Sequence, residues 1–360
     1  MFEPISVQSI QDNLRRCSRN RYSVLNSRRK REVTRCVDVF PRERYRQGKF
    51  MVSYMASGDN TGKVAYRKFL SDGFEDTHYF YYTEFVCPPE EAEKIKEQFP
   101  DFVFLLYCGR GQFGGVWLVE DLSGQIVALK LIPKKDSAHL KAEKEGLIAY
   151  RNKIRNFEHL VQIYHVGQTE DFFYYTMEAA YSVSDRYYIP ITLARLFEHC
   201  SFSPLDSADI SLDILEGLET LHSHDLAHRD IKPENIAVVD NKIKICDIGL
   251  VMDKTRKSTA GTEFFLPEDI GEIPGERFGT DCDLFAAGKV LYSMLCNDGD
   301  VARFPQIDRE ILRDRLAQKL NLILNKACAP SFRDRYACAH EFMRDLVNVK
   351  PGFRKDLGFF

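Results

Sequence analysis

Four polar residues between positions 230 and 247 have the types and the spacing that phosphoryl transfer requires. Asp230 is followed by Lys232 and Asn235, and Asp247 comes twelve residues after Asn235. A hydroxyl that attacks the γ-phosphate of ATP needs a proton acceptor, divalent metal on the phosphates, and cations against the charge of the transition state. Asp230 is suited to accept the proton of the hydroxyl, and Lys232 can supply one of the cations. Asn235 and Asp247 offer the hard oxygen ligands that Mg²⁺ prefers.

Two short strands must position these residues. The apolar runs 236–239 and 243–246 flank a turn at Asp240-Asn241, which predicts a hairpin with Asp247 at its exit. Each polar residue alone would more often be a turn or cap residue. The four together, beside the upstream motifs described next, favour catalysis.

A glycine-rich segment upstream fits a loop that lies over phosphates. It contains the residues Gly109, Arg110, Gly111, Gln112, Phe113 and Gly114. In a dinucleotide-binding fold the third glycine would open a helix, whereas here the run from Val116 to Val119 predicts a strand. No Gly-Lys-Ser/Thr ends the segment, so it is not a P-loop. The glycines therefore predict a hairpin whose backbone can approach a nucleotide closely.

The next predicted strand, 126–132, is apolar apart from Lys130. A lysine inside such a run is unfavourable unless its ammonium meets anions, which favours a phosphate ligand over an edge residue. Residues 138–155 have helical composition, and Glu143 and Glu145 are both available there to pair with Lys130. The glutamate that does not pair is expected on a solvated helix face.

Taken together, the string HRDIKPEN at 228–235, the triplet Asp247-Ile248-Gly249, the glycine-rich segment and Lys130 resemble the eukaryotic-like serine/threonine protein kinase family, in its soluble bacterial form. The resemblance runs from about Phe102 to Val349. It implies an α+β, two-lobed fold: a β-rich N-lobe with one main helix, a mainly helical C-lobe, and ATP between them. A small N-terminal extension precedes this fold.

The resemblance also assigns roles, with Lys130 holding the α- and β-phosphates. Glu145 is the expected partner of Lys130, because Leu147 and Ile148 follow it much as in the family. The gatekeeper and hinge would lie at Met177, Glu178 and Ala180. The adenine would be covered by Cys108, Val116 and Ala128, with Ala237 beneath it. Ordinary core packing explains these apolar residues equally well.

Downstream, the family pattern predicts contacts that hold the end of an activation segment. Leu266-Pro267-Glu268 resembles that end, and Arg335 is expected to pair with Glu268. Asp283 is expected to support the catalytic loop from a buried helix. Arg229 suggests a site for an activating phosphate, because guanidinium and phosphate pair bidentately. The hypothesised acceptors, which imply autophosphorylation, are Thr255, Ser258 and Thr259.

One substitution and one insertion depart from the family pattern. Ile248 stands where the family has Phe, which keeps an apolar contact but loses a ring. Residues 181–190 resemble an insertion beyond the hinge, either a lid over the nucleotide or, more commonly, a surface loop.

Composition indicates the setting and the domain organisation. Ten cysteines among 360 residues without a CxxC pair favour reduced thiols in a cytoplasmic protein, and no apolar run is long enough for a membrane span. Residues 1–50 hold 13 basic and 5 acidic residues, against 37 and 48 in the rest. We expect a basic arm at 1–50, a small α+β extension at 51–100, a kinase domain at 101–350 and a tail at 351–360. The N-lobe would cover 101–178 and the C-lobe 179–350.

Three function classes follow. The favoured one is an ATP- and Mg²⁺-dependent kinase that phosphorylates Ser or Thr of proteins. The alternative is a pseudokinase or scaffold that binds nucleotide and partners, against which the intact Lys130, Asp230, Asn235 and Asp247 argue. A small-molecule kinase is disfavoured by Lys232 and by Thr262. The basic arm could dock on an acidic partner, such as nucleic acid, a membrane surface or the kinase domain itself, or could simply be solvated.

Overall fold

The computed structural model describes ten segments of the chain: 66–69, 75–78, 89–111, 114–134, 137–180, 190–199, 201–240, 242–255, 262–297 and 301–350. Several expectations fall outside them, namely the basic arm, the tail, the insertion up to residue 189, Gln112, Phe113, Ser258 and Thr259. Residues 66–69 and 75–78 form an antiparallel pair of strands, β1 (Tyr66–Phe69) and β2 (Glu75–His78).

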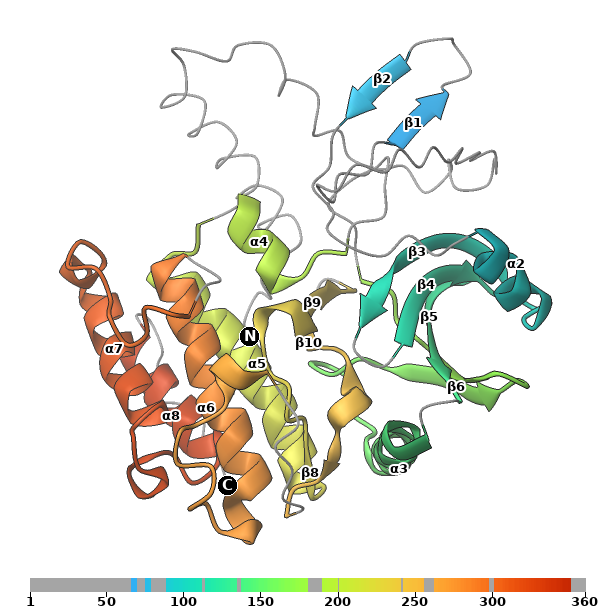
Figure 1. The fold of residues 1–360 in the computed structure, drawn as a ribbon. Helices are drawn as coiled ribbons and strands as arrows, with labels where there is room; N and C mark the ends of the chain where they lie inside the picture. Colours follow the sequence, from blue (N-terminus) through green and yellow to red (C-terminus); the bar gives the residue numbers. More distant parts are fainter. Residues whose placement is uncertain are drawn as a thin grey trace.

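An antiparallel sheet of five strands organises the N-terminal part of the kinase-like region (Figure 1). Its spatial order is β3-β4-β5-β7-β6. The bounds are β3 (Val103–Gly111), β4 (Gly114–Glu120), β5 (Ile126–Pro133), β6 (Ile163–Gln168) and β7 (Phe172–Met177). The glycine-rich segment is thus the β3–β4 hairpin, as its strand-forming continuation predicts.

Two helices cover opposite faces of this sheet, because side chains alternate along each strand. In β5, Ala128 and Ile132 pack in the main core with residues of α3 (Ser137–Lys153). Leu129 and Leu131 instead pack in a second core with residues from α2 (Pro89–Glu97) and its C-terminal end. Figure 1 shows the two helices on the two sides of the curved strands.

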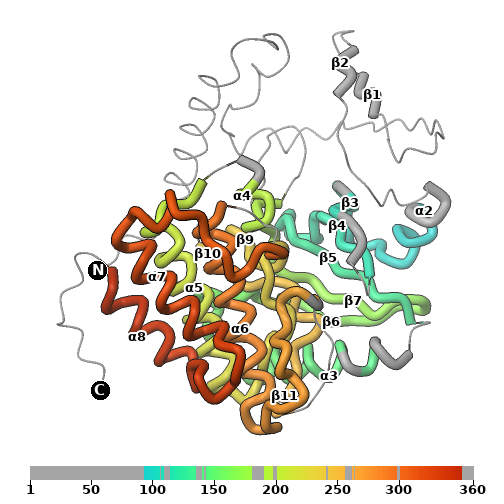
Figure 2. The backbone as a smooth tube through the Cα atoms, turned by 60° about the vertical axis from the view of Figure 1, so that its left-hand side comes forward, coloured from blue at the N-terminus to red at the C-terminus, as the bar shows by residue number. Residues whose placement is uncertain are grey.

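Helices dominate the C-terminal part, which Figure 2 shows as a bundle beside the sheet. They are α4 (Leu193–His199), α5 (Pro204–Ser223), α6 (Gly275–Cys296), α7 (Arg315–Ala327) and α8 (Ala339–Val349). A capping box starts α5: the hydroxyl of Ser203 accepts from the backbone of Asp206, whose carboxylate accepts from the backbone of Ser203. The buried helix α6 packs against α5 in the main core, which joins both parts of the molecule.

Short elements lie between these helices and carry most of the polar residues of interest. The strands are β8 (Leu226–Ala227), β9 (Ile236–Val239), β10 (Lys242–Ile245) and β11 (Met252–Asp253). The 3₁₀ turns are η2 (Pro233–Asn235), η3 (Ile248–Leu250), η4 (Glu263–Phe265), η5 (Ile311–Arg313) and η6 (Phe332–Asp334). β9 pairs with β10, which confirms the expected hairpin. The expected two-lobed α+β kinase fold is also confirmed.

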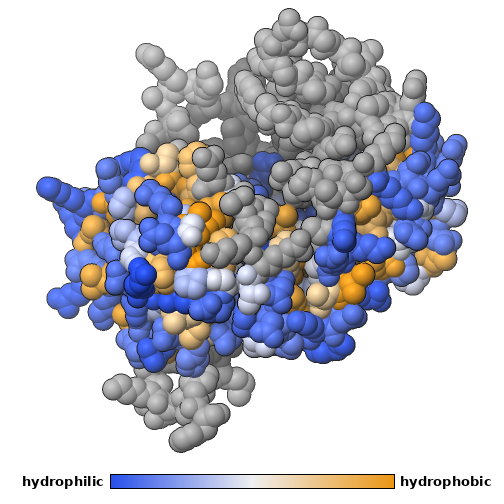
Figure 3. All heavy atoms as spheres, turned by 60° about the horizontal axis from the view of Figure 1, so that its bottom comes forward, coloured by the Kyte–Doolittle hydropathy of each residue, from blue (hydrophilic) through white to orange (hydrophobic). Residues whose placement is uncertain are grey.

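The surface is polar, with apolar side chains scattered among charged ones on the face shown in Figure 3. Among the described segments, no helix has both the length and the apolar character that a membrane crossing requires.

Candidate active site

Lys130 is buried between two carboxylates. Its Nζ lies 3.0 Å from Oε1 of Glu143 on α3 and 2.7 Å from Oδ1 of Asp247, which follows β10. Lys130 and Glu143 are both almost fully buried, whereas about half of the Asp247 side chain is exposed to solvent. β5, the helix α3 that follows it and the distant segment after β10 therefore meet at one ammonium group.

Burial and charge oppose each other in this cluster. Burial alone would lower the pKa of Lys130, but Asp247 and Glu143 hold it well above its usual value. Burial would raise the pKa of Asp247, yet Lys130 lowers it below the ordinary range. For Glu143 burial prevails over Lys130 and raises the pKa. Lys130 is thus a permanent cation and Asp247 a permanent anion at neutral pH.

The expected pairing of Lys130 with Glu145 is wrong, because Glu143 takes that place. Glu143 lies on the buried side of α3 together with Leu147 and Tyr150, at spacings of four and three residues. Glu145 and Ile148 are on the exposed side. Counting from Leu147 and Tyr150 along a helical period would have selected Glu143 from the sequence.

Two further residues hold the pair, and the sequence analysis missed both. The hydroxyl of Tyr175 on β7 is fully buried and lies 3.5 Å from Oε1 of Glu143. Gly146 lets α3 approach the segment after Asp247, since a Cβ at Gly146 would overlap the carbonyl oxygen of Val251. The register of α3 against η3 therefore depends on this glycine.

The second cluster surrounds Asp230. Its Oδ2 accepts from Nδ2 of Asn235 at 2.8 Å and lies 2.8 Å from Nζ of Lys232. Its Oδ1 accepts at 2.8 Å from the hydroxyl of Thr262, which itself accepts at 2.9 Å from Nζ of Lys232. Asp230, Lys232 and Thr262 form a closed ring of polar contacts, and Asn235 joins it through Asp230. Thr262, which together with Lys232 disfavoured a small-molecule kinase, thus lies next to Asp230.

Asp283 holds the backbone of this loop from inside α6, as the sequence led us to expect. Its Oδ2 accepts from the backbone N–H of His228 at 2.8 Å, and its Oδ1 accepts from that of Arg229 at 2.7 Å. The backbone of Arg229 has φ +71°, which is uncommon for a residue other than glycine. The fully buried Asp283 therefore stabilises a strained turn next to Asp230.

Asp247 also has left-handed backbone, with φ +51°. Its carboxylate accepts from the N–H of Gly249, and the Ile248 side chain is fully buried in the main core. Ile248 thus keeps the apolar contact expected of it. The turn directs the carboxylate of Asp247 to Lys130 rather than to the core.

Four of the residues expected around adenine lie on strands of the five-stranded sheet, namely Cys108, Val116, Ala128 and Met177. Ala128 of β5 is the register partner of Met177 of β7, and both are buried in the main core, against which Val116 packs. Ala237 is buried on β9, and Ala180 is half-buried. Their contact with a base stays a prediction.

Glu178, which is expected at the hinge, has a buried partner that the sequence analysis did not find. Both oxygens of Glu178 accept at 2.8 Å from Nζ of Lys244, and Oε2 also accepts from the backbone N–H of Gln162. Lys244 is 5% exposed. β10 alternates lysine and isoleucine, so no signal in the sequence separates the buried Lys244 from the more exposed Lys242.

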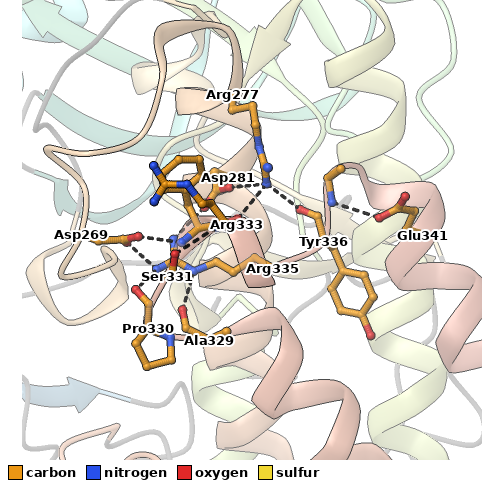
Figure 4. Close-up of polar contacts among 12 residues, drawn as sticks. Asp269, Arg277, Asp281, Ala329, Pro330, Ser331, Arg333, Arg335, Tyr336 and Glu341 are labelled. Atoms are coloured by element: carbon orange, nitrogen blue, oxygen red, sulfur yellow. Dashed lines mark hydrogen bonds and ion pairs between the residues drawn. The ribbon is translucent and has the colours of Figure 1, made fainter.

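The end of the activation segment is held by a different acid from the one expected (Figure 4). Arg335 donates to Asp269 and, at 2.7 Å, to Asp281 of α6, which also accepts from Arg277. Glu268 is exposed. The expected pair of Arg335 with Glu268 is therefore wrong by one residue, because a turn at 268–270 directs Asp269 inward.

Comparison with known proteins agrees with this geometry. Residues 102–356 match the model of the protein kinase domain family. "Calcium-dependent protein kinase 4" of Plasmodium berghei is 27% identical over 67% of this chain and 50% of its own length. "Calcium/calmodulin-dependent protein kinase type 1" of Caenorhabditis elegans is 30% identical over 61% and 64%. Human "RAC-beta serine/threonine-protein kinase" is 30% identical over 56% and 42%.

The match to these relatives covers only part of each protein, about half of the Plasmodium kinase and less of the human one. The family model, however, spans well over half of this chain, and the two polar clusters lie within the matched residues. The chain therefore belongs to the protein kinase family.

Proposed function

We propose that this protein is an ATP-dependent serine/threonine protein kinase. The observation that carries the proposal is the polar cluster in which Asn235, Lys232 and Thr262 all contact the carboxylate of Asp230. It combines a proton acceptor, an amide ligand, a cation and a hydroxyl within hydrogen-bonding distance. The Lys130–Asp247 pair supplies a second cation and a second carboxylate.

In the proposed reaction, Asp230 accepts the proton of a substrate hydroxyl as its oxygen attacks the γ-phosphorus and the bond to the ADP oxygen breaks. Lys232 lies against the same carboxylate and offsets negative charge on the transferred group. Lys130, fixed by Glu143, would bind the α- and β-phosphates. The contact of Lys232 with Thr262 favours Ser and Thr over Tyr as acceptors.

Asn235 and Asp247 fit a magnesium site. The Asn235 amide donates through Nδ2 to Asp230, so its carbonyl oxygen remains a ligand. Asp247 is anionic and partly exposed. Mg²⁺ in such sites is usually held by one or two protein groups together with substrate phosphates. Bound metal would neutralise the phosphate oxygens.

We further propose autophosphorylation, with Thr255 as the acceptor among the described residues. Thr255 is exposed, and its hydroxyl donates to Asp253 at 2.6 Å. The guanidinium of Arg229 donates to the carbonyl of the same Asp253 at 3.1 Å. A phosphate on Thr255 would thus be only two residues from Asp253, whose carbonyl the buried Arg229 already contacts.

The remaining parts of the proposal concern the setting. A kinase domain at about 101–350 is supported by the family match to 102–356. The basic arm would dock on an acidic surface, because residues 1–50 carry an excess of eight positive charges. A cytoplasmic location is supported by six unbridged cysteines in the described segments.

The test is transfer of radiolabel from ATP in the presence of Mg²⁺, to the protein itself and to a basic substrate protein. Asp230→Asn is compared with Asp240→Asn, an exposed turn residue. We expect label on Ser or Thr with the wild type and with Asp240→Asn, and none with Asp230→Asn. Nucleotide binding without any transfer by the wild type would contradict the proposal and favour a scaffold.

A further inference from the structure

The outer face of the five-stranded sheet has a core of its own, separate from the one that contains the active site. Trp117 on β4 and Leu129 on β5 point to this face, and both are buried. Ile95 of α2 and Phe99, two residues after its end, cover them. α2 precedes the matched kinase domain, yet it buries part of that domain's sheet.

An aromatic row crosses this outer core: Tyr174, Phe99, Phe104, Trp117 and Tyr107. The centroids of successive rings are 4.9, 6.1, 5.2 and 4.7 Å apart. Phe99 meets Tyr174 and Phe104 meets Trp117 edge to face, at 83° and 82°. Such contacts are directional, so each ring constrains the position of the next.

One end of the aromatic row lies on the glycine-rich hairpin. The ring of Tyr107 faces Gly115 so closely that a Cβ on Gly115 would lie 3.1 Å from Cε2 of the tyrosine. Gly115 is the register partner of Arg110, and Gly114 that of Gly111, in the expected phosphate-binding loop. Tyr107 therefore contacts the backbone of the loop directly.

The other end of the row is fixed on the far side of the sheet. Gln98, next to Phe99, donates to Oδ2 of Asp171 at 2.9 Å and accepts from the hydroxyl of Thr169 at 2.8 Å. Both partners belong to the turn between β6 and β7. The segment after α2 thus connects the β6–β7 edge of the sheet with β3 at the opposite edge.

We propose that Phe99 is a positioning residue for ATP, which acts through the aromatic row on the glycine-rich hairpin. The three glycines of the loop contribute no side chains to packing, so the packing of the two flanking strands helps to set the height of the loop over the phosphates. The inference rests on the proposed function, because it concerns the affinity for a nucleoside triphosphate.

Full-length protein allows a direct test, because Trp117, the fourth ring of the row, is the single tryptophan of the chain. Binding of the non-hydrolysable analogue AMP-PNP with Mg²⁺, and of adenosine, is measured by calorimetry, with Trp117 emission recorded in parallel. The variants are Phe99→Ala and Phe104→Leu. The control is Val127→Ala, which removes methyl groups from the same outer core but leaves every ring of the row in place.

We expect Phe99→Ala and Phe104→Leu to weaken AMP-PNP binding about three- to tenfold, the size of one aromatic contact. Adenosine binding should stay within about twofold, because the loop covers phosphates rather than the base. Val127→Ala should lower the melting temperature but leave both affinities unchanged.

Equal losses for AMP-PNP and adenosine, or for the control and the ring variants, would mean general destabilisation of the N-lobe and would overturn the inference. Unchanged AMP-PNP binding in both ring variants would overturn it as well. If the wild type itself bound neither AMP-PNP nor adenosine, the proposed function would fail, and the inference with it.

Discussion

Gly249 and Glu143 are in direct contact across the interface of η3 and α3. A Cβ built on Gly249 would lie 2.8 Å from Oε1 of Glu143 and 3.0 Å from Nζ of Lys130. The ion pair of Lys130 and Glu143, which would bind phosphates in the proposed reaction, therefore packs directly against Gly249, which has no side chain. The glycine after Asp247 and Ile248 is a packing requirement as well as part of a motif.

Gly249→Ala should reduce phosphotransfer at least about tenfold, since a methyl group must displace either Glu143 or Lys130. The measurement is kcat/KM for ATP. Gly271→Ala is the matched control, because a Cβ there meets nothing within 4 Å. Similar losses in both variants would argue against the steric explanation.

The correction at α3 predicts opposite results for two glutamates two residues apart. Glu143→Gln should lower kcat/KM for ATP by about tenfold or more, because it removes one of the two anions that hold the buried Lys130. Glu145→Gln should retain nearly full activity, since Glu145 is on the exposed side of the helix. A larger loss in Glu145→Gln would restore the original assignment.

Two lysines of β10 allow a comparison of buried and exposed ion pairs. Lys244→Met should lower the free energy of unfolding by about 3 kcal/mol, because it leaves the Glu178 carboxylate buried without its cation. Lys242→Met should change it by less than about 1 kcal/mol, because the pair with Glu158 is exposed. Urea unfolding followed by fluorescence gives both values, and equal effects would count against the buried pair.

The pair that ends the activation segment can be assigned by charge removal. Asp269→Asn should lower the free energy of unfolding by about 2 kcal/mol, since Asp269 accepts from both Arg335 and the backbone of Phe332. Glu268→Gln, one residue earlier and exposed, should have little effect. Thermal melting distinguishes the two; a larger shift for Glu268→Gln would contradict the register found here.

Stability should depend on pH through Asp213 of α5. Burial raises the pKa of Asp213 from 3.8 to about 7. The folded protein thus keeps a proton that the unfolded chain has lost, and this contribution to stability declines as pH rises from about 4 to about 7. The charged groups around it are His159, Glu216, Asp209 and Lys350.

His159 adds to the same trend, because its carboxylate neighbours raise its pKa against the effect of burial. That stabilisation is present below about pH 6.5 and is lost as pH rises through the folded pKa. Asp213→Asn should therefore melt at a higher temperature relative to the wild type at pH 8 than at pH 5. Asp308→Asn, at an exposed site, is the control. If the difference in melting temperature between Asp213→Asn and the wild type became smaller toward pH 8, the predicted direction of the pH dependence would be wrong.

The sequence alone determined the chemistry and much of the local structure. Asp230, Asn235 and Asp247 were found because residue type and spacing along one loop and one hairpin are local properties. Strand β5, helix α3 and the β9–β10 hairpin follow from apolar periodicity and turn residues, which are also local.

Only the tertiary structure decided which partners these residues take. Glu143 rather than Glu145 meets Lys130, and Asp269 rather than Glu268 meets Arg335, because the rotation of a helix or turn selects one of two similar acids. Phe99 contacts Tyr174 of the sheet, and Lys244 pairs with Glu178. Each of these two contacts joins residues more than 60 positions apart in the sequence. No local pattern encodes such distances, since they arise only when separate elements pack into one core.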